Sequence, residues 1–299
     1  MNYHSAISQL AVRCLSLLMV FVSGCQAKAQ KDVITFDVGS YTVTTLSEGQ
    51  QQGNKSILIG ATEEMLNEAI PNGTFPNAVN AFLMVTGDKT LLFDAGLGKK
   101  LFDNLKKYGK TVANIDAIVL THMHGDHIGG LLRDGERAFP AAALYIPQTE
   151  HDYWMNGQSG GGAARVRNVI NAYREQLHLF TPGEIAGTEE LFPGIRSVAA
   201  YGHTPGHTGY LVESNGSKLF IWGDLTHAMA IQIPYPEVAV TYDTDPVQAV
   251  ESRQQLLKYL SDNKIRIAGM HIAFPGIGEI KKSAAHGYDF TPVCECEGR

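Results

Sequence analysis

The sequence predicts an α/β fold with stacked β-sheets. Short apolar runs rich in β-branched residues, typical of buried strands, are mixed along the chain with amphipathic segments typical of helices. Several apolar runs end directly in histidine or aspartate, and the carboxyl ends of strands are where open α/β sheets usually carry ligand sites. With 299 residues, 44% of them hydrophobic, the chain can bury a substantial core in one large domain or two tightly packed halves.

Residues 1–25 have a composition of their own. A nine-residue apolar run, Cys14–Val22, is too short to span a bilayer and is followed by small residues, which is the pattern of a signal peptide. Val22–Cys25 resembles a bacterial lipobox, in which Cys25 would become the lipidated first residue; ordinary cleavage after Ala29 is the alternative. We expect a signal peptide with a lipobox-like end over residues 1–25, a short tether over 26–32 and one folded domain over 33–299. The protein would then be exported, either to the bacterial periplasm or to the outer membrane as a lipoprotein.

The predicted domain begins with strands and continues with mixed helices and strands. Turn residues at Gly39, Gly87 and Asn215 predict three hairpins, and Thr62 and Asp245 are predicted helix N-caps. The predicted strands are Val33–Val38, Tyr41–Leu46, Ala78–Thr86, Thr90–Asp94, Ala117–Leu120, Ala142–Pro147, Ile195–Ala200, Gly209–Glu213, Lys218–Trp222 and Ile265–Gly269. The predicted helices are Thr62–Ala69, Leu97–Tyr108, Gln148–Met155, Ala163–Leu177 and Asp245–Asp262.

Composition argues against some partners. The formal net charge is −6, and no basic stretch is concentrated enough to bind nucleic acid. Of the four cysteines, Cys14 and Cys25 lie in the targeting segment, while Cys294 and Cys296 are two positions apart, a strained spacing for a disulfide. We therefore expect a frayed C-terminal tail and no disulfide framework.

The most informative stretch is AIVLTHMHGDHIGG, residues 117–130. A short apolar run ends there in His122, His124, Asp126 and His127. Imidazole and carboxylate groups are ligands for borderline metals such as zinc. His122 and His124 can point in one direction, whereas the adjacent Asp126 and His127 are expected to diverge. This geometry suits two metal ions better than one.

Other predicted strands end in similar residues. GHTPGHTG contains His203 and His207, LFIWGD ends in Asp224, and IAGMH ends in His271. A lone histidine is most often a structural polar residue. Because these residues each follow a predicted strand, they can converge at one edge of a sheet, and their number favours a metal site.

Together, THMHGDHIGG, GHTPGHTG, LFIWGDLTH and GMHIAFPG resemble the metallo-β-lactamase superfamily, whose signature is HxHxDH. The resemblance runs from about Tyr41 to Pro292. It is closest to the branch of methyl parathion hydrolase and the acyl-homoserine lactonases, through GHTPGHTGYLVESNGSKLFIWGDL and HIAFPGIG. It implies a four-layer αββα sandwich with two mixed β-sheets, and a hydrolase domain over residues 33–299.

The resemblance also implies a ligand set. One divalent ion would be held by His122, His124 and His207, the other by Asp126, His127 and His271, and Asp224 would bridge them. Spacing alone does not choose between His203 and His207. The family's ligand is the histidine after Pro-Gly, so the resemblance assigns His207 and leaves His203 without contact to the metal. Asp94 would support the metal loop by a hydrogen bond.

Two divalent ions are therefore expected as cofactors, with zinc first and manganese, iron or cobalt as alternatives. In this family pattern a metal-bridging hydroxide cleaves lactones, esters or aryl phosphotriesters, with Asp126 and Asp224 as the catalytic residues. Phe102, Trp154, His227 and Phe274 are candidate substrate-pocket residues, because an aromatic, apolar pocket would suit acyl or aryl groups.

Three alternatives remain. The first is a β-lactam hydrolase, which the aspartate at position 224 disfavours because the zinc-dependent β-lactamases do not use it. The second is a mononuclear iron dioxygenase of the same fold, and the third a non-enzymatic lipoprotein that binds zinc. The expected partner is a small-molecule substrate and not nucleic acid, while membrane attachment through a lipidated Cys25 and a homodimer stay open.

Overall fold

The computed structural model describes residues 32–157 and 160–294. The predicted signal peptide and most of the tether lie outside these ranges, so both stay predictions. Within the described ranges, every helix is too short or too polar to cross a membrane.

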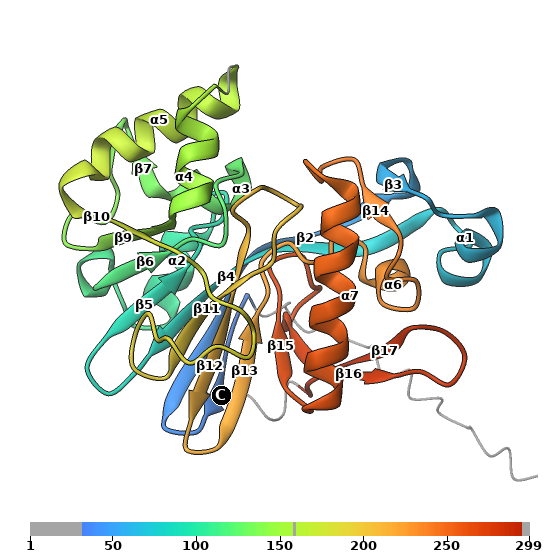
Figure 1. The fold of residues 1–299 in the computed structure, drawn as a ribbon. Helices are drawn as coiled ribbons and strands as arrows, with labels where there is room; N and C mark the ends of the chain where they lie inside the picture. Colours follow the sequence, from blue (N-terminus) through green and yellow to red (C-terminus); the bar gives the residue numbers. More distant parts are fainter. Residues whose placement is uncertain (1–31, 158–159, 295–299) are drawn as a thin grey trace, which may run out of the picture. The chain divides into compact units, whose positions relative to one another are not determined.

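Two mixed β-sheets form the centre of the domain (Figure 1). The seven-stranded sheet has the order β1 (Val33–Val38), β2 (Tyr41–Asn54), β4 (Thr74–Val85), β5 (Thr90–Phe93), β6 (Ala117–Val119), β9 (Ala143–Pro147) and β10 (Leu177–Phe180). The six-stranded sheet has the order β11 (Ile195–Ala199), β12 (Thr208–Ser214), β13 (Ser217–Ile221), β15 (Arg266–Ala268), β16 (Ile277–Lys282) and β17 (Tyr288–Pro292). Two small pairs join β3 (Leu58–Ile59) to β14 (Ala239–Val240), and β7 (Leu132–Arg133) to β8 (Glu136–Arg137).

Seven α-helices are described, and short 3-10 turns separate several elements. The helices are α1 (Glu63–Ala69), α2 (Leu101–Lys107), α3 (Gly125–Ile128), α4 (Gln148–Met155), α5 (Gly161–Tyr173), α6 (Met229–Gln232) and α7 (Pro246–Asp262). The 3-10 turns are η1 (Lys55–Ile57), η2 (Val112–Asn114), η3 (Gly129–Leu131) and η4 (Arg174–Gln176).

The buried side chains define four layers. One core cluster, with Leu101 of α2 and Val166 of α5, packs these helices on the outer face of the seven-stranded sheet. A second cluster fills the space between the sheets and includes Phe93 and Tyr210, whose rings are 5.2 Å apart. A third packs α7 on the six-stranded sheet. The αββα sandwich predicted from the sequence is therefore confirmed.

Local sequence signals position most elements as predicted. The Thr62 hydroxyl accepts a hydrogen bond from the backbone N–H of Met65, and the Asp245 carboxylate caps α7 by accepting from Val247 and Gln248. The β12–β13 hairpin turns at Asn215, whose φ of 47° lies in the left-handed region tolerated by asparagine. Side-chain capping and turn chemistry therefore set these boundaries.

Three predictions are wrong in detail. The predicted helix Leu97–Tyr108 begins only at Leu101, because the residues before it form a loop. The strands β10, β16 and β17 have no counterpart among the predicted strands, since they are short or partly exposed and lack a clear alternation. Cys294 is disulfide-bonded, which contradicts the expected tail without a disulfide.

Glu48 explains the late start of α2. It lies at an irregularity of β2 between Ser47 and Gly49, and such irregularities redirect a side chain out of the strand pattern. Its buried carboxylate accepts hydrogen bonds from four backbone N–H groups, at 2.9 to 3.2 Å, which belong to Leu97, Gly98, Lys99 and Leu101. The loop wraps around this carboxylate and becomes helical only at Leu101.

We predict that Glu48→Gln lowers the free energy of unfolding by about 3 kcal/mol, because the amide NH₂ would face backbone donors that the carboxylate now accepts. Urea unfolding measures the change. Glu251→Gln, at an exposed position of α7, is the matched control and should change stability little. Equal stabilities of both variants would show that the carboxylate does not hold the loop.

Candidate metal centre

The metal-binding sequence motif lies at the carboxyl end of β6. After this strand the chain continues into a loop with His122 and His124, and then into α3, which carries Asp126 and His127. The His122 and His124 rings meet edge to face, with centroids 4.7 Å apart. The motif thus brings four ligand-type side chains to one end of the seven-stranded sheet.

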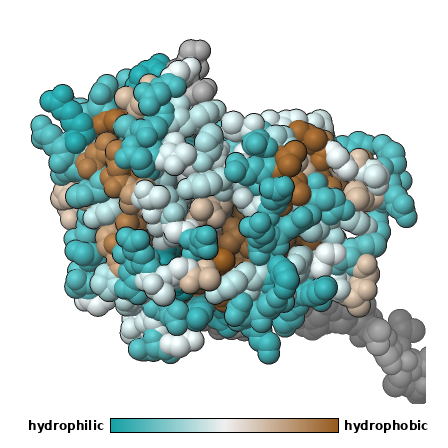
Figure 2. Space-filling view, viewed as in Figure 1, coloured by the Kyte–Doolittle hydropathy of each residue, from teal (hydrophilic) through white to brown (hydrophobic). Residues whose placement is uncertain are grey.

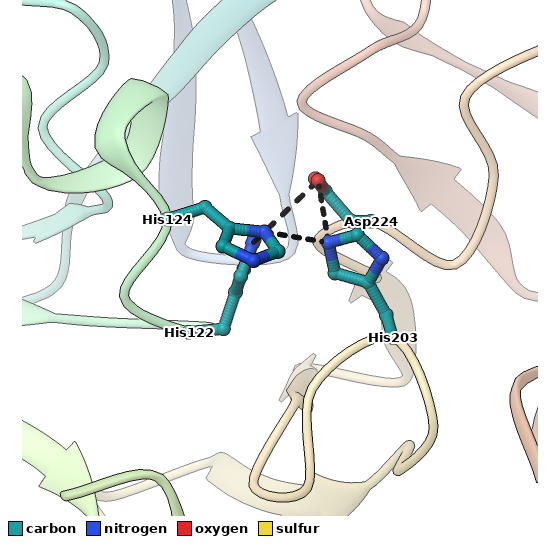
Figure 3. Close-up of side chains that lie close together, drawn as sticks. All are labelled: His122, His124, His203 and Asp224. Carbon is teal, nitrogen blue, oxygen red and sulfur yellow. Dashed lines mark hydrogen bonds and ion pairs between the residues drawn. The ribbon is translucent and has the colours of Figure 1, made fainter. Parts of the chain in front are cut away.

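The six-stranded sheet contributes three more residues at the same place. His203 lies in the loop between β11 and β12, Asp224 follows β13, and His271 follows β15. Figure 3 shows the rings of His122, His124 and His203 and the Asp224 carboxylate pointing toward one another. The site is therefore assembled from both sheets of the sandwich.

Asp224 occupies the centre of this arrangement and is nearly fully buried, with 3% exposure. Its Oδ1 lies 3.2 Å from His127 Nε2. Its Oδ2 lies 3.1 Å from His271 Nε2 and 3.3 Å from His203 Nε2. Oδ1 therefore faces His127, whereas Oδ2 faces His203 and His271.

The ligand-type atoms form three overlapping groups in which all atoms lie within 4.8 Å of one another. The groups are His122, His124, His203 and Asp224; Asp126, His127 and His271; and Asp224, His227 and His271. We call the first group the first cluster and the second group the second cluster.

The residues fit divalent metal ions. The buried atoms His127 Nε2 and Asp224 Oδ1 have no hydrogen-bond partner within the described residues, although an unpaired buried polar atom is costly. A metal ion between them would satisfy both. The donor set of imidazole nitrogens and carboxylate oxygens is the one used by zinc and related ions.

Several imidazole rings are oriented by hydrogen bonds at Nδ1, on the side of the ring away from the centre of the site. The Nδ1–H groups of His127, His203 and His271 donate to Asp94 at 2.7 Å, Asp243 at 2.9 Å and the Ala78 carbonyl at 2.8 Å. The Nδ1 of His122 is 3.0 Å from the Thr121 hydroxyl, which in turn donates to Asp94. Each contact fixes the ring and leaves its Nε2 facing the centre, as metal-binding histidines require. The predicted supporting role of Asp94 is borne out by these hydrogen bonds.

The choice of His207 over His203 is contradicted by the geometry. The Nδ1–H of His207 donates to the Ala200 carbonyl at 2.8 Å, and its Nε2 accepts from the backbone N–H of Asp224 at 2.8 Å. Both ring nitrogens are therefore used, and His207 has none left for a metal. Its ring instead ties the GHTPGHTG loop to the residue at the centre of the site. A Cβ at Gly223 would lie 2.4 Å from His207 Nε2, so only glycine allows this approach.

Electrostatics favour binding of cations at Asp224. Burial opposes its ionisation, but the surrounding histidines, led by His127 and His271, hold the pKa of this carboxyl well below its usual range. Burial lowers the pKa of His124 to about 3, so its ring is neutral and can bind a metal. For His203, burial also favours the neutral ring, but hydrogen bonds to Asp224 and Asp243 raise its pKa to about 9.

A cavity of about 610 Å³ opens onto the site. Its wall is formed mainly by the end of β2, with single residues from η1, β4 and the loop after β14, and the ligand-type residues line the rest. Those lining residues that lie outside the two clusters are Gln51, Gln52, Gly53, Asn54, Ile57, Asn77, Gly125, His227 and Tyr242. Neutral amide side chains are prominent in this wall, beside the apolar Ile57 and the aromatic Tyr242.

Only one of the four candidate pocket residues lines this cavity. His227 does, with its Nε2 3.0 Å from Asp224 Oδ2. Phe102 instead packs against Phe139 in the core, and Phe274 packs against the core between the sheets. Trp154 lines a neighbouring cavity of about 240 Å³, which shares His124 and Gly125 with the first cavity and is also lined by Arg165.

Three functional groups were not predicted. The amide wall, Asp243 behind His203, and the buried Glu150 of α4 all lie outside the motifs. Their distances along the sequence from the histidines carry no information, because the directions of the strands and the paths of the loops decide which side chains reach the site.

This fold and site define a metal-dependent hydrolase class. The sequence profile of the Metallo-beta-lactamase superfamily matches residues 74–271, and the chain belongs to this family. Among curated proteins, it is 32% identical over 154 residues to the probable metallo-hydrolase YqgX of Bacillus subtilis (strain 168). It is 50% identical over 155 residues to the anti-Pycsar protein Apyc1 of Paenibacillus sp. (strain J14). These matches cover 50% and 49% of the chain, and 67% and 60% of the relatives.

Two solved structures resemble nearly the whole described domain. The crystal structure of the hydrolase AbOPH of the beta lactamase superfamily matches with a TM-score of 0.82 and 25% identity, over 89% of this chain and 99% of that one. AidC, a dizinc quorum-quenching lactonase in complex with the product N-hexanoyl-L-homoserine, matches with a TM-score of 0.79 and 26% identity, over 88% and 99%. These neighbours agree with the lactonase-like branch indicated by the sequence.

We predict that His203→Ala and His207→Ala have opposite consequences. The first should reduce the metal content, because it removes a nitrogen from the first cluster. The second should retain its metal at saturating concentration but unfold at a lower temperature, because it removes two buried hydrogen bonds. Elemental analysis and thermal unfolding distinguish the two. Loss of metal in His207→Ala alone would restore the assignment made from the sequence.

Proposed function

We propose that the protein is a dinuclear metal-dependent hydrolase that cleaves lactones or neutral esters. One observation carries the proposal: the Asp224 carboxylate of the first cluster faces His203 of its own cluster and also His127 and His271 of the second. A carboxylate in this position can bridge two ions. The histidines that surround it are oriented for binding by hydrogen bonds on their far sides.

In this proposal the first ion is held by His122, His124 and His203, and the second by Asp126, His127 and His271. Divalent ions of the zinc type, when bound, lower the pKa of water to about 7 and polarise the oxygen of the group under attack. Asp224 fixes the distance between the two clusters. Asp126 is half-buried, is the most accessible member of its cluster and lines the cavity, so it can also orient water.

The cavity supports a neutral substrate. Its lining contains no lysine or arginine within the described residues, while Gln51, Gln52 and Asn54 offer neutral hydrogen-bonding groups. A carboxylate or phosphate far from the scissile bond would find no opposite charge there. β-Lactams carry such a carboxylate, so the cavity favours a lactone, a neutral ester or a neutral phosphotriester over them. The lactonase AidC is a neighbour consistent with this choice.

Export is part of the proposal. The pattern of residues 1–25 supports a role outside the cytoplasm, with Cys25 as the site of lipidation. Mass spectrometry of the mature N-terminus tests it: a lipidated Cys25 supports membrane anchoring, and an intact Met1 in exporting cells contradicts export.

We predict chelation-sensitive hydrolysis by the purified chain from Gln26 onward. The substrates are a long-chain acyl-homoserine lactone, an aryl acetate and methyl parathion, measured with and without prior chelation. Asp224→Ala should lower kcat/KM by more than about 10³-fold and reduce metal content, because it removes the group between the clusters. Asp262→Ala, on the exposed face of α7, is the control and should keep full activity. An active, fully metallated Asp224→Ala protein would refute the proposal.

We further predict selection against negative charge. Two γ-butyrolactones are compared that carry side chains of equal length, one ending in a methyl group and one in a carboxylate. The carboxylate should lower kcat/KM by about 10-fold or more, which corresponds to about 1.4 kcal/mol of unfavourable binding. Gln52→Lys should reduce the difference in kcat/KM between the two lactones, because the lysine adds a positive charge to the cavity wall. Equal kcat/KM values for both lactones would contradict selection against negative charge, while the proposal of a hydrolase would stand.

A further inference from the structure

Glu150 is a buried carboxylate with no assigned role. It lies on α4, outside both metal-binding loops, and its side chain is fully buried, with 0% exposure. Burying a carboxylate is costly unless its oxygens accept enough hydrogen bonds. The contacts that Glu150 makes therefore indicate what it holds in place.

Each oxygen of Glu150 serves a different part of the site. Oε1 accepts from the backbone N–H of Met123 at 2.9 Å and from the Trp154 indole N–H at 2.7 Å. Oε2 accepts from the Thr204 hydroxyl at 2.6 Å and from the backbone N–H of Gly206 at 3.2 Å. Glu150 accepts all four hydrogen bonds, which requires acceptor lone pairs on both oxygens and therefore suits the ionised carboxylate.

Two of the residues that donate to Glu150 are neighbours in sequence of histidines in the first cluster. Met123 lies between His122 and His124, and Thr204 directly follows His203. One loop comes from the seven-stranded sheet and the other from the six-stranded sheet. Glu150 thus links the two loops whose three histidines form the first cluster.

The link is tightly packed. A Cβ at Gly206 would lie 2.2 Å from the backbone nitrogen of Glu150, so the second loop passes directly against α4. A shift of α4 or a shorter side chain at position 150 would therefore change the spacing of the loops. The carboxylate acts as a spacer as well as an acceptor.

The second cluster is supported by other groups. Asp94 holds His127, and the Ala78 carbonyl holds His271. Neither contact involves Glu150. Glu150 therefore supports the first cluster and not the second, whereas Asp94 holds His127 and also reaches His122 of the first cluster through the Thr121 hydroxyl.

We propose that Glu150 is a positioning residue that sets the geometry of the first cluster, and with it the affinity of the first metal ion but not of the second. The inference rests on the proposed dinuclear function. It assigns Glu150 no contact with substrate or metal.

The test begins with Glu150→Gln, which keeps the size but points NH₂ at two donors. Metal is titrated into the demetallated wild type and variant, and binding is followed by elemental analysis and by the absorption spectrum of added Co²⁺. Affinity for one ion should fall by about 10- to 100-fold, and the second ion should bind as in the wild type. After dialysis the variant should keep one ion per chain where the wild type keeps two.

Matched variants separate positioning from general stability. Thr204→Val removes one hydroxyl donor and keeps the shape, while Thr204→Ser restores the donor. Only Thr204→Val should weaken the same ion. Asp262→Ala, on the exposed face of α7, is the control and should retain both ions. The Thr204 pair decides the question if Glu150→Gln does not fold.

The outcomes are distinct. Selective loss of one ion in Glu150→Gln or in Thr204→Val, with rescue in Thr204→Ser, supports the proposal. Equal loss of both ions, or wild-type binding in both variants, overturns it. A wild type that binds a single ion or none would instead contradict the proposed dinuclear function.

Discussion

The site depends on one buried carboxylate among imidazole rings. Asp224 is ionised and nearly inaccessible to water, and the groups that compensate its charge are the histidines aimed at it. A buried charge without such partners would cost several kcal/mol, on the order of the stability of a whole domain. The positions of His127, His203 and His271 are therefore constrained both by the folding of the core and by any metal that they bind.

The sandwich makes this arrangement possible because both sheets end at the same place. Strands β6, β13 and β15 each finish just before a ligand-type residue. Rigid strands set the starting points of the loops, and hydrogen bonds donated to the carboxylates of Asp94, Asp243 and Glu150 set the final orientations. Two loops from different sheets would otherwise be free to separate by more than a metal site tolerates.

The sequence was sufficient for the layers of the fold and for most of the ligand-type residues, because apolar runs, caps and the HxHxDH signature are local signals. Prediction from the sequence failed where a contact between residues far apart in the chain determines the local structure. His203 and His207 are equivalent in spacing, and only the path of the loop shows that His207 is occupied by Ala200 and Asp224. The start of α2 likewise depends on Glu48, about fifty residues earlier in the chain. Phe102 and Phe274 look like pocket residues only if their packing is ignored.

The extension of β2 beyond the central sheet has an evolutionary consequence. Gln51, Gln52 and Asn54 are exposed and lie in the part of β2 that pairs with the start of β4, away from the buried core. Exposed positions tolerate substitution with little change in stability. Figure 2 shows one face of the molecule, on which hydrophilic and hydrophobic residues are mixed. New substrates can therefore be acquired by exchanging three or four surface side chains while the buried catalytic machinery is inherited unchanged.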